Sequence, residues 1–386
     1  MKLEYTEDQR AFRSEVRAWM EANVPDAPLP SFDLTREGFE AHRDWERRLN
    51  EGRWGMVTWP KQYGGRGLDL IRWLIFEEEY YRAKAPTRVN QNGIFLLGPT
   101  MMEFGSDEQK ARFLPRMAAG DDIWAQAWSE PGAGSDLAGV RSTCTRDGDH
   151  YLLNGQKIWS SRAVFADWAF GLFREPGSER HQGLSLILFP LTAEGVTRRP
   201  IASLDGDLQF AELFFDNVRV PAADRLGEEG EGWKICMATA GFERGLMLRS
   251  PARYQEAAKR LIALHERHKD GLPASMAERV ARCWMDADAY ALAIYAMCSR
   301  LEAGGTIGPE SSTNKIFWSE LDIALHQTAL DILGPRGELT GSAPDAGDIG
   351  DWLDGYVFSL AGPIYAGSNE IQRNIIAERM LGLPRK

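Results

Sequence analysis

The 386-residue sequence divides into three stretches with different periodicity. Through residues 1–122, apolar side chains recur every three or four positions, which is typical of amphipathic helices. Thr6 and Gln9 have the spacing of a capping box, and Ser106 stands where a helix N-cap is expected. These patterns predict four helices, at residues 6–24, 37–51, 70–81 and 107–117.

Near Trp124 the pattern changes to short apolar runs that end at glycine or proline, which is typical of strands. Ser185–Pro190 and Phe210–Val220 are predicted strands. The segment Tyr151–Trp159 contains Asn154–Gly155, a strong hairpin signal, and is predicted to form two short strands around that turn.

Long helical patterns return at Gly232, with few helix breakers. The predicted helical segments are 232–268, 275–302, 312–333 and 370–381, with a loop over 334–350. The sequence therefore predicts an α+β chain of three domains: an N-terminal all-α domain (1–122), a middle β domain (123–230) and a C-terminal four-helix bundle (231–386).

The composition excludes some classes of function. A net charge of −11 argues against nucleic acid as a partner, because binding phosphates needs clustered Lys and Arg. No stretch reaches the roughly 18 apolar residues of a membrane span, so no membrane insertion is expected. The four cysteines lack CxxC spacing and are predicted to be buried, reduced thiols of a cytoplasmic protein. The sequence predicts no metal site.

The segment Trp128–Asp136 (Trp-Ser-Glu-Pro-Gly-Ala-Gly-Ser-Asp) indicates a ligand-binding loop. Gly132 and Gly134 are able to take backbone angles that other residues avoid, so that backbone N–H groups converge on an anion. Ser129 and Ser135 add hydroxyl donors. The segment matches neither a P-loop nor a Rossmann turn, and by itself it also fits a glycine-rich surface loop.

Three further motifs extend this pattern to the whole chain. They are Pro-Lys-Gln-Tyr-Gly-Gly at 60–65, Asn-Gly-Gln-Lys-Ile-Trp-Ser-Ser at 154–161, and Ile-Gln-Arg-Asn-Ile-Ile-Ala-Glu-Arg at 371–379. Together with the helix–sheet–helix order and the loop at 128–136, they make the chain resemble the acyl-CoA dehydrogenase family. Four motifs in the right order make chance agreement improbable.

The resemblance implies a flavoprotein oxidoreductase of acyl-CoA catabolism. Such an enzyme binds FAD and an acyl-CoA thioester, removes the α-proton with a base and transfers the β-hydrogen as hydride to flavin N5. The electrons pass to electron-transfer flavoprotein, and the enzyme is a tetramer. The chemistry requires a carboxylate over Cα, donors to the thioester carbonyl and a flavin face against the Cα–Cβ bond.

The resemblance also assigns residues to the flavin. Ser161 is expected near N5, Trp159 against the isoalloxazine, and Ser135 between the flavin and the CoA arm. The cofactor-binding residues implied in this way are Gln126, Trp128, Ser129, Gly134, Ser135, Trp159, Ser161, Arg267, Ser368 and Glu370. Two of them have plainer readings: Trp159 also fits a cross-strand core aromatic, and Ser135 a turn hydroxyl that caps Asp136.

Many family members carry the base in a Tyr-Glu-Gly-Thr sequence, where this chain has Tyr365-Ala366-Gly367-Ser368. Ala366 cannot accept a proton, and the helix dipole alone explains a carboxylate at Glu370. In the isovaleryl-CoA and long-chain branches the base lies on an earlier helix, directly before an Arg.

Glu243 and Arg244 match that earlier position, and apolar neighbours there would raise the pKa of a carboxyl. Glu243 is therefore the predicted base, although it also fits an ordinary surface Glu paired with an Arg. Ser135, Arg244 and Gly367 are the predicted substrate-binding residues.

The chain departs from the family pattern where one subunit normally contacts the flavin of another. Arg267 is aligned with the usual Arg, but Asp270 replaces a Phe and Asp331 replaces a Gln expected near the diphosphate. An Asp beside a diphosphate is unfavourable unless it is paired or turned away. Either a divergent homo-oligomer binds FAD through other contacts, or a partner chain in a hetero-oligomer supplies them. The homotetramer is favoured because most oligomers are homo-oligomers.

The acyl group is left open by the sequence. Asn90–Gly98 is expected to line the acyl end of the pocket, and Ala366 and Gly367 leave room for branched or ring-bearing groups. A flavin monooxygenase or acyl-CoA oxidase on the same fold, or a catalytically silent subunit, are the alternatives. The Glu243–Arg244 pair favours the dehydrogenase, because a monooxygenase needs no α-proton base.

Overall fold

The computed structural model describes residues 4–244, 249–340, 343 and 350–385, without the side chains of 242–244 and 350. The contacts of the chain divide it into two compact units. The first contains Met1–Val24, Asp69–Ala85 and Arg244–Lys386, and the second contains Pro25–Leu68 and Pro86–Glu243. The predicted N-terminal helices are thus shared between the units, and the predicted domain boundaries remain a prediction.

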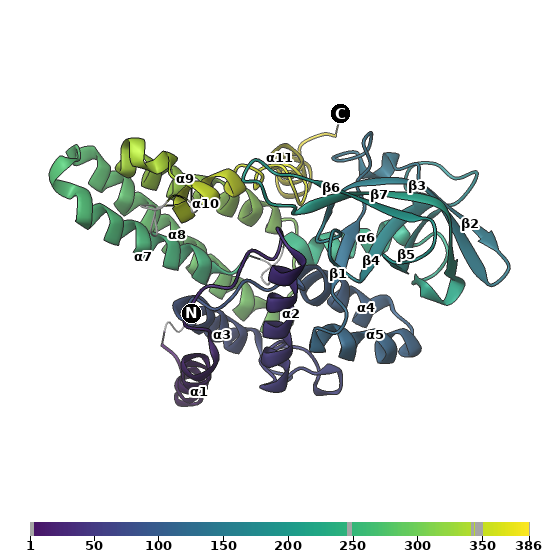
Figure 1. Ribbon diagram of the computed structural model, residues 1–386, viewed down its shortest axis with the longest axis horizontal. Helices are drawn as coiled ribbons and strands as arrows, with labels where there is room; N and C mark the ends of the chain where they lie inside the picture. Colours follow the sequence, from purple (N-terminus) through teal and green to yellow (C-terminus); the bar gives the residue numbers. More distant parts are fainter. Residues whose placement is uncertain (1–3, 245–248, 341–342, 344–349, 386) are drawn as a thin grey trace. The chain divides into compact units, whose positions relative to one another are not determined.

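The first unit is helical, and three long antiparallel helices form its main body (Figure 1). Its helices are α1 (Glu7–Asn23), α3 (Leu70–Arg82), α7 (Pro251–His268), α8 (Ala274–Glu302), α9 (Ser311–Leu333), α10 (Gly350–Ser359) and α11 (Asn369–Ile375), followed by a π-helical turn at Ile376–Met380. The capping box predicted from Thr6 and Gln9 starts α1. Among described residues, no helix is long and apolar enough to cross a membrane.

The second unit is built on an eight-stranded sheet, in which seven strands follow the order β6-β7-β3-β2-β4-β5-β8 and the eighth, β1, pairs in parallel with β4. The strands are β1 (Trp124–Ala127), β2 (Thr143–Asp147), β3 (His150–Ser161), β4 (Trp168–Arg174), β5 (Leu184–Pro190), β6 (Val196–Ile201), β7 (Phe210–Pro221) and β8 (Arg225–Leu226). Its helices are α2 (Arg36–Glu51), α4 (Gly98–Phe104), α5 (Asp107–Ala119) and α6 (Gly232–Arg244), and Asn92–Leu97 forms a π-helical segment before α4.

Buried aromatic rings fix the helices of the second unit on its sheet. Trp124 of β1 stacks on Trp168 of β4 with ring centroids 5.5 Å apart, and Phe113 of α5 meets both rings edge-on. The helical layer and the sheet therefore share one core.

Asn90 connects that helical layer to the sheet. Its side chain, which is fully buried, donates to the carbonyls of Met117 and Asp122 and accepts from the N–H of Trp124. Its own backbone N–H donates to the Glu46 carboxylate. The side-chain amide of Asn90 thus pairs with backbone groups from the last turn of α5 to the first residue of β1. Without it these buried polar groups would lose a hydrogen-bond partner.

The hairpin predicted at Asn154–Gly155 is wrong. β3 continues through both residues, with a register shift against β7 between Leu153 and Gly155, and the turn lies earlier, between Asp147 and His150. The tight turn that Asn-Gly signals needs positive φ at both central residues, and here only Gly155 has it, at 130°. Gly155 is instead required because a Cβ there would lie 2.4 Å from the Ser142 hydroxyl.

Two details of the C-terminal prediction also change. The helical pattern over 232–268 is divided into α6 and α7, and Pro251 is the first residue of α7. The predicted loop at 334–350 is followed by the helix α10, and the closing helix is α11 with its π-helical turn.

We expect Asn90→Ala to lower the free energy of unfolding by about 2–4 kcal/mol, because it leaves two buried carbonyls and one buried N–H without their partner. Urea unfolding followed by tryptophan fluorescence measures this. Asn23→Ala at the end of α1, where one partly buried bond to the Trp19 carbonyl is lost, is the control and should cost well under half as much. Equal effects of the two variants would contradict the role given to Asn90.

Candidate functional site

The predicted loop at 128–136 begins with a tight turn. Glu130 and Ala133 exchange both backbone hydrogen bonds, at 3.0 and 2.9 Å, around Pro131 and Gly132. The expectation that the glycines adopt special backbone angles is wrong, since neither Gly132 nor Gly134 has positive φ. What both contribute is space, because a Cβ at either position would have no atom within 4 Å. The loop therefore offers open backbone, and Ser135 is exposed beside it.

A buried ion pair ties this loop to the second motif. Lys157 of β3 is fully buried, and its Nζ lies 2.7 Å from Oε1 of Glu130. Nζ also donates to the Trp128 carbonyl, and the Glu130 carboxylate accepts from the N–H groups of Arg141 and Ser142. Burial by itself would raise the pKa of Glu130, but the charge of Lys157 and these hydrogen bonds lower it below its ordinary value.

Trp159 is presented to solvent by a local defect in the sheet. The register of β3 against β7 shifts between Lys157 and Ser160, which leaves Ile158 and Trp159 opposite one residue of β7. Trp159 has φ of 59°, a rare conformation for a bulky residue, and 56% of it is exposed. The ring meets Phe210 of β7 edge-on at 5.9 Å, so the contact across the strands that the alternative requires is present, but Trp159 is not buried in the core. Its packing against the flavin stays a prediction.

Further contacts hold the end of this strand. The Asn92 side chain, from the π-helical segment, donates to the Ser161 carbonyl at 3.2 Å. Arg162, also at positive φ, pairs with Asp33 and stacks over Phe32. Asn92 belongs to the segment 90–98, which is predicted to line the acyl end of the pocket, and π-helical segments often occur at functional sites.

The structure also places the other residues predicted at the first motif, Ser129, Gln126 and Trp128. The Ser129 carbonyl accepts from the N–H of Ile158 at 2.9 Å, so the two motifs are joined by backbone as well. Gln126 is partly exposed on β1. The Trp128 indole is buried edge-on against Phe170, so its ring belongs to the core.

The predicted base lies at the end of α6. Glu243 and Arg244 belong to the last turn of that helix, and their side chains lie outside the described part of the structure. One turn earlier, the buried Thr239 hydroxyl is 2.9 Å from the Thr100 hydroxyl of α4. This contact fixes the end of α6 against the helix that follows the π-helical segment.

The segment Tyr365–Ser368 belongs to the other compact unit. Ala366 and Gly367 have φ of 57° and 77°, and the buried Gln372 amide donates to the carbonyls of both. Ser368 caps α11 by accepting from the Ile371 N–H. The segment is therefore strained and held in one conformation.

Glu370 is exposed at the start of α11. Hydrogen bonds from its own backbone N–H and from the Ser368 hydroxyl lower the pKa of its carboxyl. A lowered pKa makes a carboxylate a weaker base, which agrees with the preference for Glu243.

The positions that depart from the family pattern are exposed. Arg267 is exposed in the last turn of α7. Asp331, near the end of α9, has Oδ2 2.7 Å from the Arg279 guanidinium of α8. The unfavourable charge of this Asp is thus neutralised within the chain.

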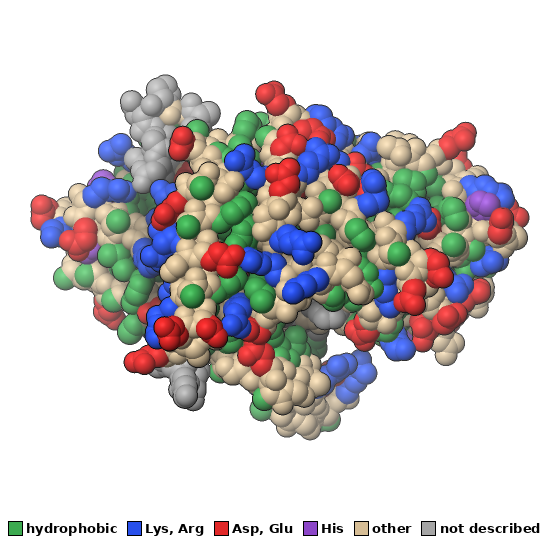
Figure 2. Space-filling view, turned by 90° about the horizontal axis from the view of Figure 1, so that it is seen from below, with side chains coloured by type: hydrophobic (Ala, Val, Ile, Leu, Met, Phe, Trp, Pro, Cys, Tyr) green, Lys and Arg blue, Asp and Glu red, His purple; other side chains and the backbone are tan. Residues whose placement is uncertain are grey.

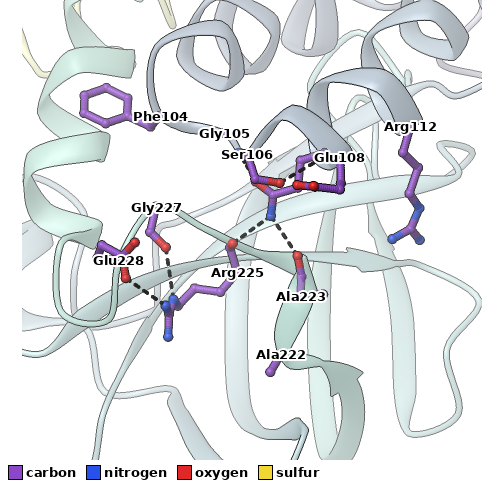
Figure 3. Close-up of a pocket in the computed structure, with 11 residues that line it drawn as sticks. Phe104, Gly105, Ser106, Glu108, Arg112, Ala222, Ala223, Arg225, Gly227 and Glu228 are labelled. Carbon is purple, nitrogen blue, oxygen red and sulfur yellow. Dashed lines mark hydrogen bonds and ion pairs between the residues drawn. The ribbon is translucent and has the colours of Figure 1, made fainter.

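A hollow of about 650 Å³ lies elsewhere in the second unit, and none of the predicted site residues line it (Figure 3). Gln109, one of its lining residues, donates to the carbonyls of Ala223 and Arg225, and the Arg225 side chain donates to the Gly227 carbonyl and pairs with Glu228. Its polar groups therefore bond to one another. On the face seen in Figure 2, acidic and basic side chains are interspersed.

Comparison with known proteins decides the family. Models of the N-terminal, middle and C-terminal domains of acyl-CoA dehydrogenases match residues 6–121, 125–218 and 230–381. The chain belongs to the acyl-CoA dehydrogenase family. This confirms the resemblance and the predicted α+β fold class, and it identifies the chain as an oxidoreductase enzyme of that family.

Individual relatives match over nearly their full length. The acyl-CoA dehydrogenase IpdE1 of Mycobacterium tuberculosis is 41% identical over 98% of this chain and 99% of its own. Among solved structures, the ChsE4–ChsE5 complex of M. tuberculosis matches with a TM-score of 0.86 and 32% identity, covering both chains fully (100% each). The Tcur3481–Tcur3483 steroid acyl-CoA dehydrogenase matches with a TM-score of 0.88 and 28% identity, with the same coverage.

Several residues that shape the site were not predicted from the sequence. Glu130 and Lys157 stand inside the two motifs, but no pairing between them was inferred. The signal was a lysine at a position of β3 that faces the core, together with an acidic residue inside the other motif. Asn92, Thr239 and Arg162 gave no local signal, since their roles depend on distant partners.

We expect the stabilisation from the Glu130–Lys157 pair to depend on pH. The folded-state pKa of Glu130 is lowered, so the contribution is present above the unfolded value of about 4.3 and is lost as pH falls through the lower folded value. Glu130→Gln should lower Tm most near neutral pH, and the difference from wild type should shrink toward pH ~3.

The control is Asp147→Asn, which breaks the exposed pair between Asp147 and Arg219 and should change Tm little. A Tm difference between wild type and Glu130→Gln that stays constant over this pH range would contradict the prediction.

Proposed function

We propose that this chain is an FAD-dependent dehydrogenase that introduces an α,β double bond into an acyl-CoA thioester, with Glu243 as the base. FAD, when bound, accepts the β-hydrogen as hydride, and electron-transfer flavoprotein takes up the electrons. The chain's own part is to hold the flavin, orient the thioester and receive the α-proton on a carboxylate.

The observation that carries the proposal is the presentation of Trp159. An exposed indole in a strained conformation, on a bulge next to the buried Lys157 and the Arg162–Asp33 pair, is costly unless a flat partner covers its exposed face. The open backbone at Gly132 and Gly134 suits the approach of such a group. Gln126, Ser129, Gly134, Ser135, Trp159 and Ser161 would hold the flavin from this unit, with Trp128 supporting them from the core, and Arg267, Ser368 and Glu370 remain assigned by resemblance.

Two arguments favour Glu243 as the base: the other candidate positions, Ala366 and Glu370, are poor bases, and the helix that carries Glu243 is held in place. Ala366 carries no ionisable group, and the carboxyl pKa of exposed Glu370 is lowered. The helix that carries Glu243 is anchored one turn earlier by Thr239. Ser135, Arg244 and Gly367 complete the proposed substrate contacts.

For the substrate, we propose an acyl group that is bulky and ring-bearing. The methyl group of Ala366 and the absence of a side chain at Gly367 support this, because they leave room in the segment where relatives carry the catalytic Glu. A solved structure 28% identical to this chain is described as a steroid acyl-CoA dehydrogenase, which points to the same class.

For the assembly, we propose a heterotetramer that works in the cytoplasm. Most oligomers are homo-oligomers, which favours a homotetramer. In this chain, however, Asp331 stands where a Gln is expected to face the diphosphate, and Asp331 is paired with Arg279. The structural relatives ChsE4–ChsE5 and Tcur3481–Tcur3483 are each named as two different chains. The four cysteines are buried free thiols, as expected in a reducing compartment.

Glu243→Gln should retain FAD but slow anaerobic flavin bleaching by acyl-CoA by about 10²–10⁴-fold, because Gln cannot accept the α-proton. Stopped-flow absorbance measures this. Glu231→Gln is the matched control, since that partly exposed Glu directly precedes the same helix and its carboxylate is bound by Lys234 and by the N–H of Glu228. Bleaching of Glu243→Gln at the wild-type rate would show that the base is elsewhere.

The chain expressed alone should retain well below one FAD per protomer, and full occupancy should require co-expression with a partner chain. Asp331→Gln separates the two assemblies, because it restores the family residue and releases the Arg279 cation. In a homo-oligomer this variant should raise FAD occupancy, whereas in a hetero-oligomer occupancy should stay low. Asp351→Asn, which alters another exposed Asp of the same unit, is the control. One FAD per protomer in the chain alone would exclude the heterotetramer.

A further inference from the structure

Helix α8 has a second apolar face, opposite the one that packs inside the bundle. Its inner face contains buried residues such as Ile294 and Met297. On its outer face, every exposed residue between Cys283 and Cys298 is apolar: Met285, Ala289, Leu292, Ala293 and Ala296. Met285 is 61% exposed and Leu292 45%. A helix that is apolar on both faces is normally buried on both, so we expect another surface to cover the outer face of α8.

The neighbouring helix α7 shows the surface that a solvent-facing helix normally has. Its exposed positions from 259 to 267 include the charged residues Lys259, Arg260 and Glu266. On α8 the exposed charges lie on either side of the stretch 285–296, at Arg282 and Arg300. Within that stretch, all of which the structure describes, no exposed residue is charged. The outer face of α8 therefore has the character of a contact surface.

The apolar residues of this face have the spacing of a coiled-coil seam. Met285, Ala289, Leu292 and Ala296 follow one another at intervals of four, three and four residues, which is the alternation of heptad positions a and d. At a rise of 1.5 Å per residue the seam is about 16 Å long. In such a seam each side chain fits between side chains of a facing helix, so the pattern predicts a helix as the covering element.

The same seam is complementary to itself when two copies run antiparallel. A two-fold axis midway between Ala289 and Leu292 places Leu292 of one copy opposite Ala289 of the other, and Met285 opposite Ala296. Each layer then combines a large side chain with a small one, which fills space evenly. A parallel pair would place like against like and alternate crowded layers with empty ones. A self-complementary surface is what a two-fold interface requires.

We propose that two copies of this chain associate through the outer faces of their α8 helices, packed antiparallel about a two-fold axis. The inference goes beyond the proposed function and does not depend on the base or the substrate. It applies to a homotetramer and equally to a heterotetramer with two copies of each chain, because both contain such a pair.

The seam is the centre of a wider surface. Stable interfaces bury about 1,200–2,000 Å² in total, more than one short helix pair supplies. The Gln255 side chain of α7 donates to Asp288 of α8 at 2.9 Å, and this antiparallel register brings Ile262 of α7 level with Ala281 of α8. Ile262 is 37% exposed, so apolar surface continues from the seam onto α7.

Light scattering of the FAD-loaded protein, with its partner chain if FAD retention requires one, counts the copies in the assembly. Wild type should contain at least two copies of this chain. Leu292→Asp places a carboxylate at the centre of the seam and should halve that number, because an unpaired charge is costly to bury. Leu204→Asp is the matched control, since Leu204 is an 85% exposed leucine of the other compact unit, and it should leave the number unchanged.

Cysteine substitutions test the antiparallel register without weakening the seam. Met285→Cys and Ala296→Cys, combined in one chain, should give a covalent dimer under mild oxidation, because the two positions face each other across the axis. They lie about 16 Å apart along one helix, too far for a disulfide within a chain. Each single variant should give no covalent dimer. The four native cysteines are buried, so they do not compete.

Three results would overturn the inference: a wild-type assembly with one copy of this chain, an unchanged number of copies in Leu292→Asp, or single cysteine variants that cross-link as readily as the double variant. If Leu292→Asp fails to fold, the cross-linking pattern still decides the question. Failure of acyl-CoA to bleach the flavin would count against the proposed function alone, because neither measurement here depends on turnover.

Discussion

The Glu130–Lys157 ion pair is the interaction on which the site depends. It joins the loop at 128–136 to β3, and its hydrogen bonds extend to the backbone at Arg141 and Ser142 and to the Leu172 carbonyl of β4. Removing two charges from water is expensive, so the pair is stable only because the remaining donors and acceptors around it are satisfied. A loop with one open face has little apolar surface to bury, and polar contacts on its other side give it a fixed shape.

The strained backbone of the site is supported in the same way. Trp159 and Arg162 both have positive φ, which costs roughly 1–3 kcal/mol at each residue. Asp33 forms an ion pair with Arg162, and the Asn92 side chain donates to the carbonyl of Ser161, which lies between Trp159 and Arg162 in the sequence. In the other unit, Gln372 does the same for Ala366 and Gly367. Each strained segment is also one to which the resemblance assigns a ligand contact, which is where stored strain is expected.

Local patterns predicted much of this fold and failed at specific points. The capping box at Thr6 and the N-cap at Ser106 formed as predicted, because every group in them lies within four residues. The Asn154–Gly155 hairpin failed because the long partner strand β7 pairs with β3 on both sides of that dipeptide. Gly132 and Gly134 were singled out because glycine is able to take unusual backbone angles, but neither has positive φ. Their contribution is the open space beside the backbone, where a side chain would otherwise stand.

The sequence by itself determined the family, the order of helical and β regions, and the loss of the usual base at Ala366. These follow from residue type and short-range spacing, which folding does not change. Only the tertiary structure decided that Lys157 meets Glu130, that Trp159 faces outward on a bulge, and that Asn92 donates to the Ser161 carbonyl. Those contacts join residues 27 to 69 positions apart, or depend on a register shift between strands. Such pairings are set by how the whole chain packs, and no local pattern encodes them.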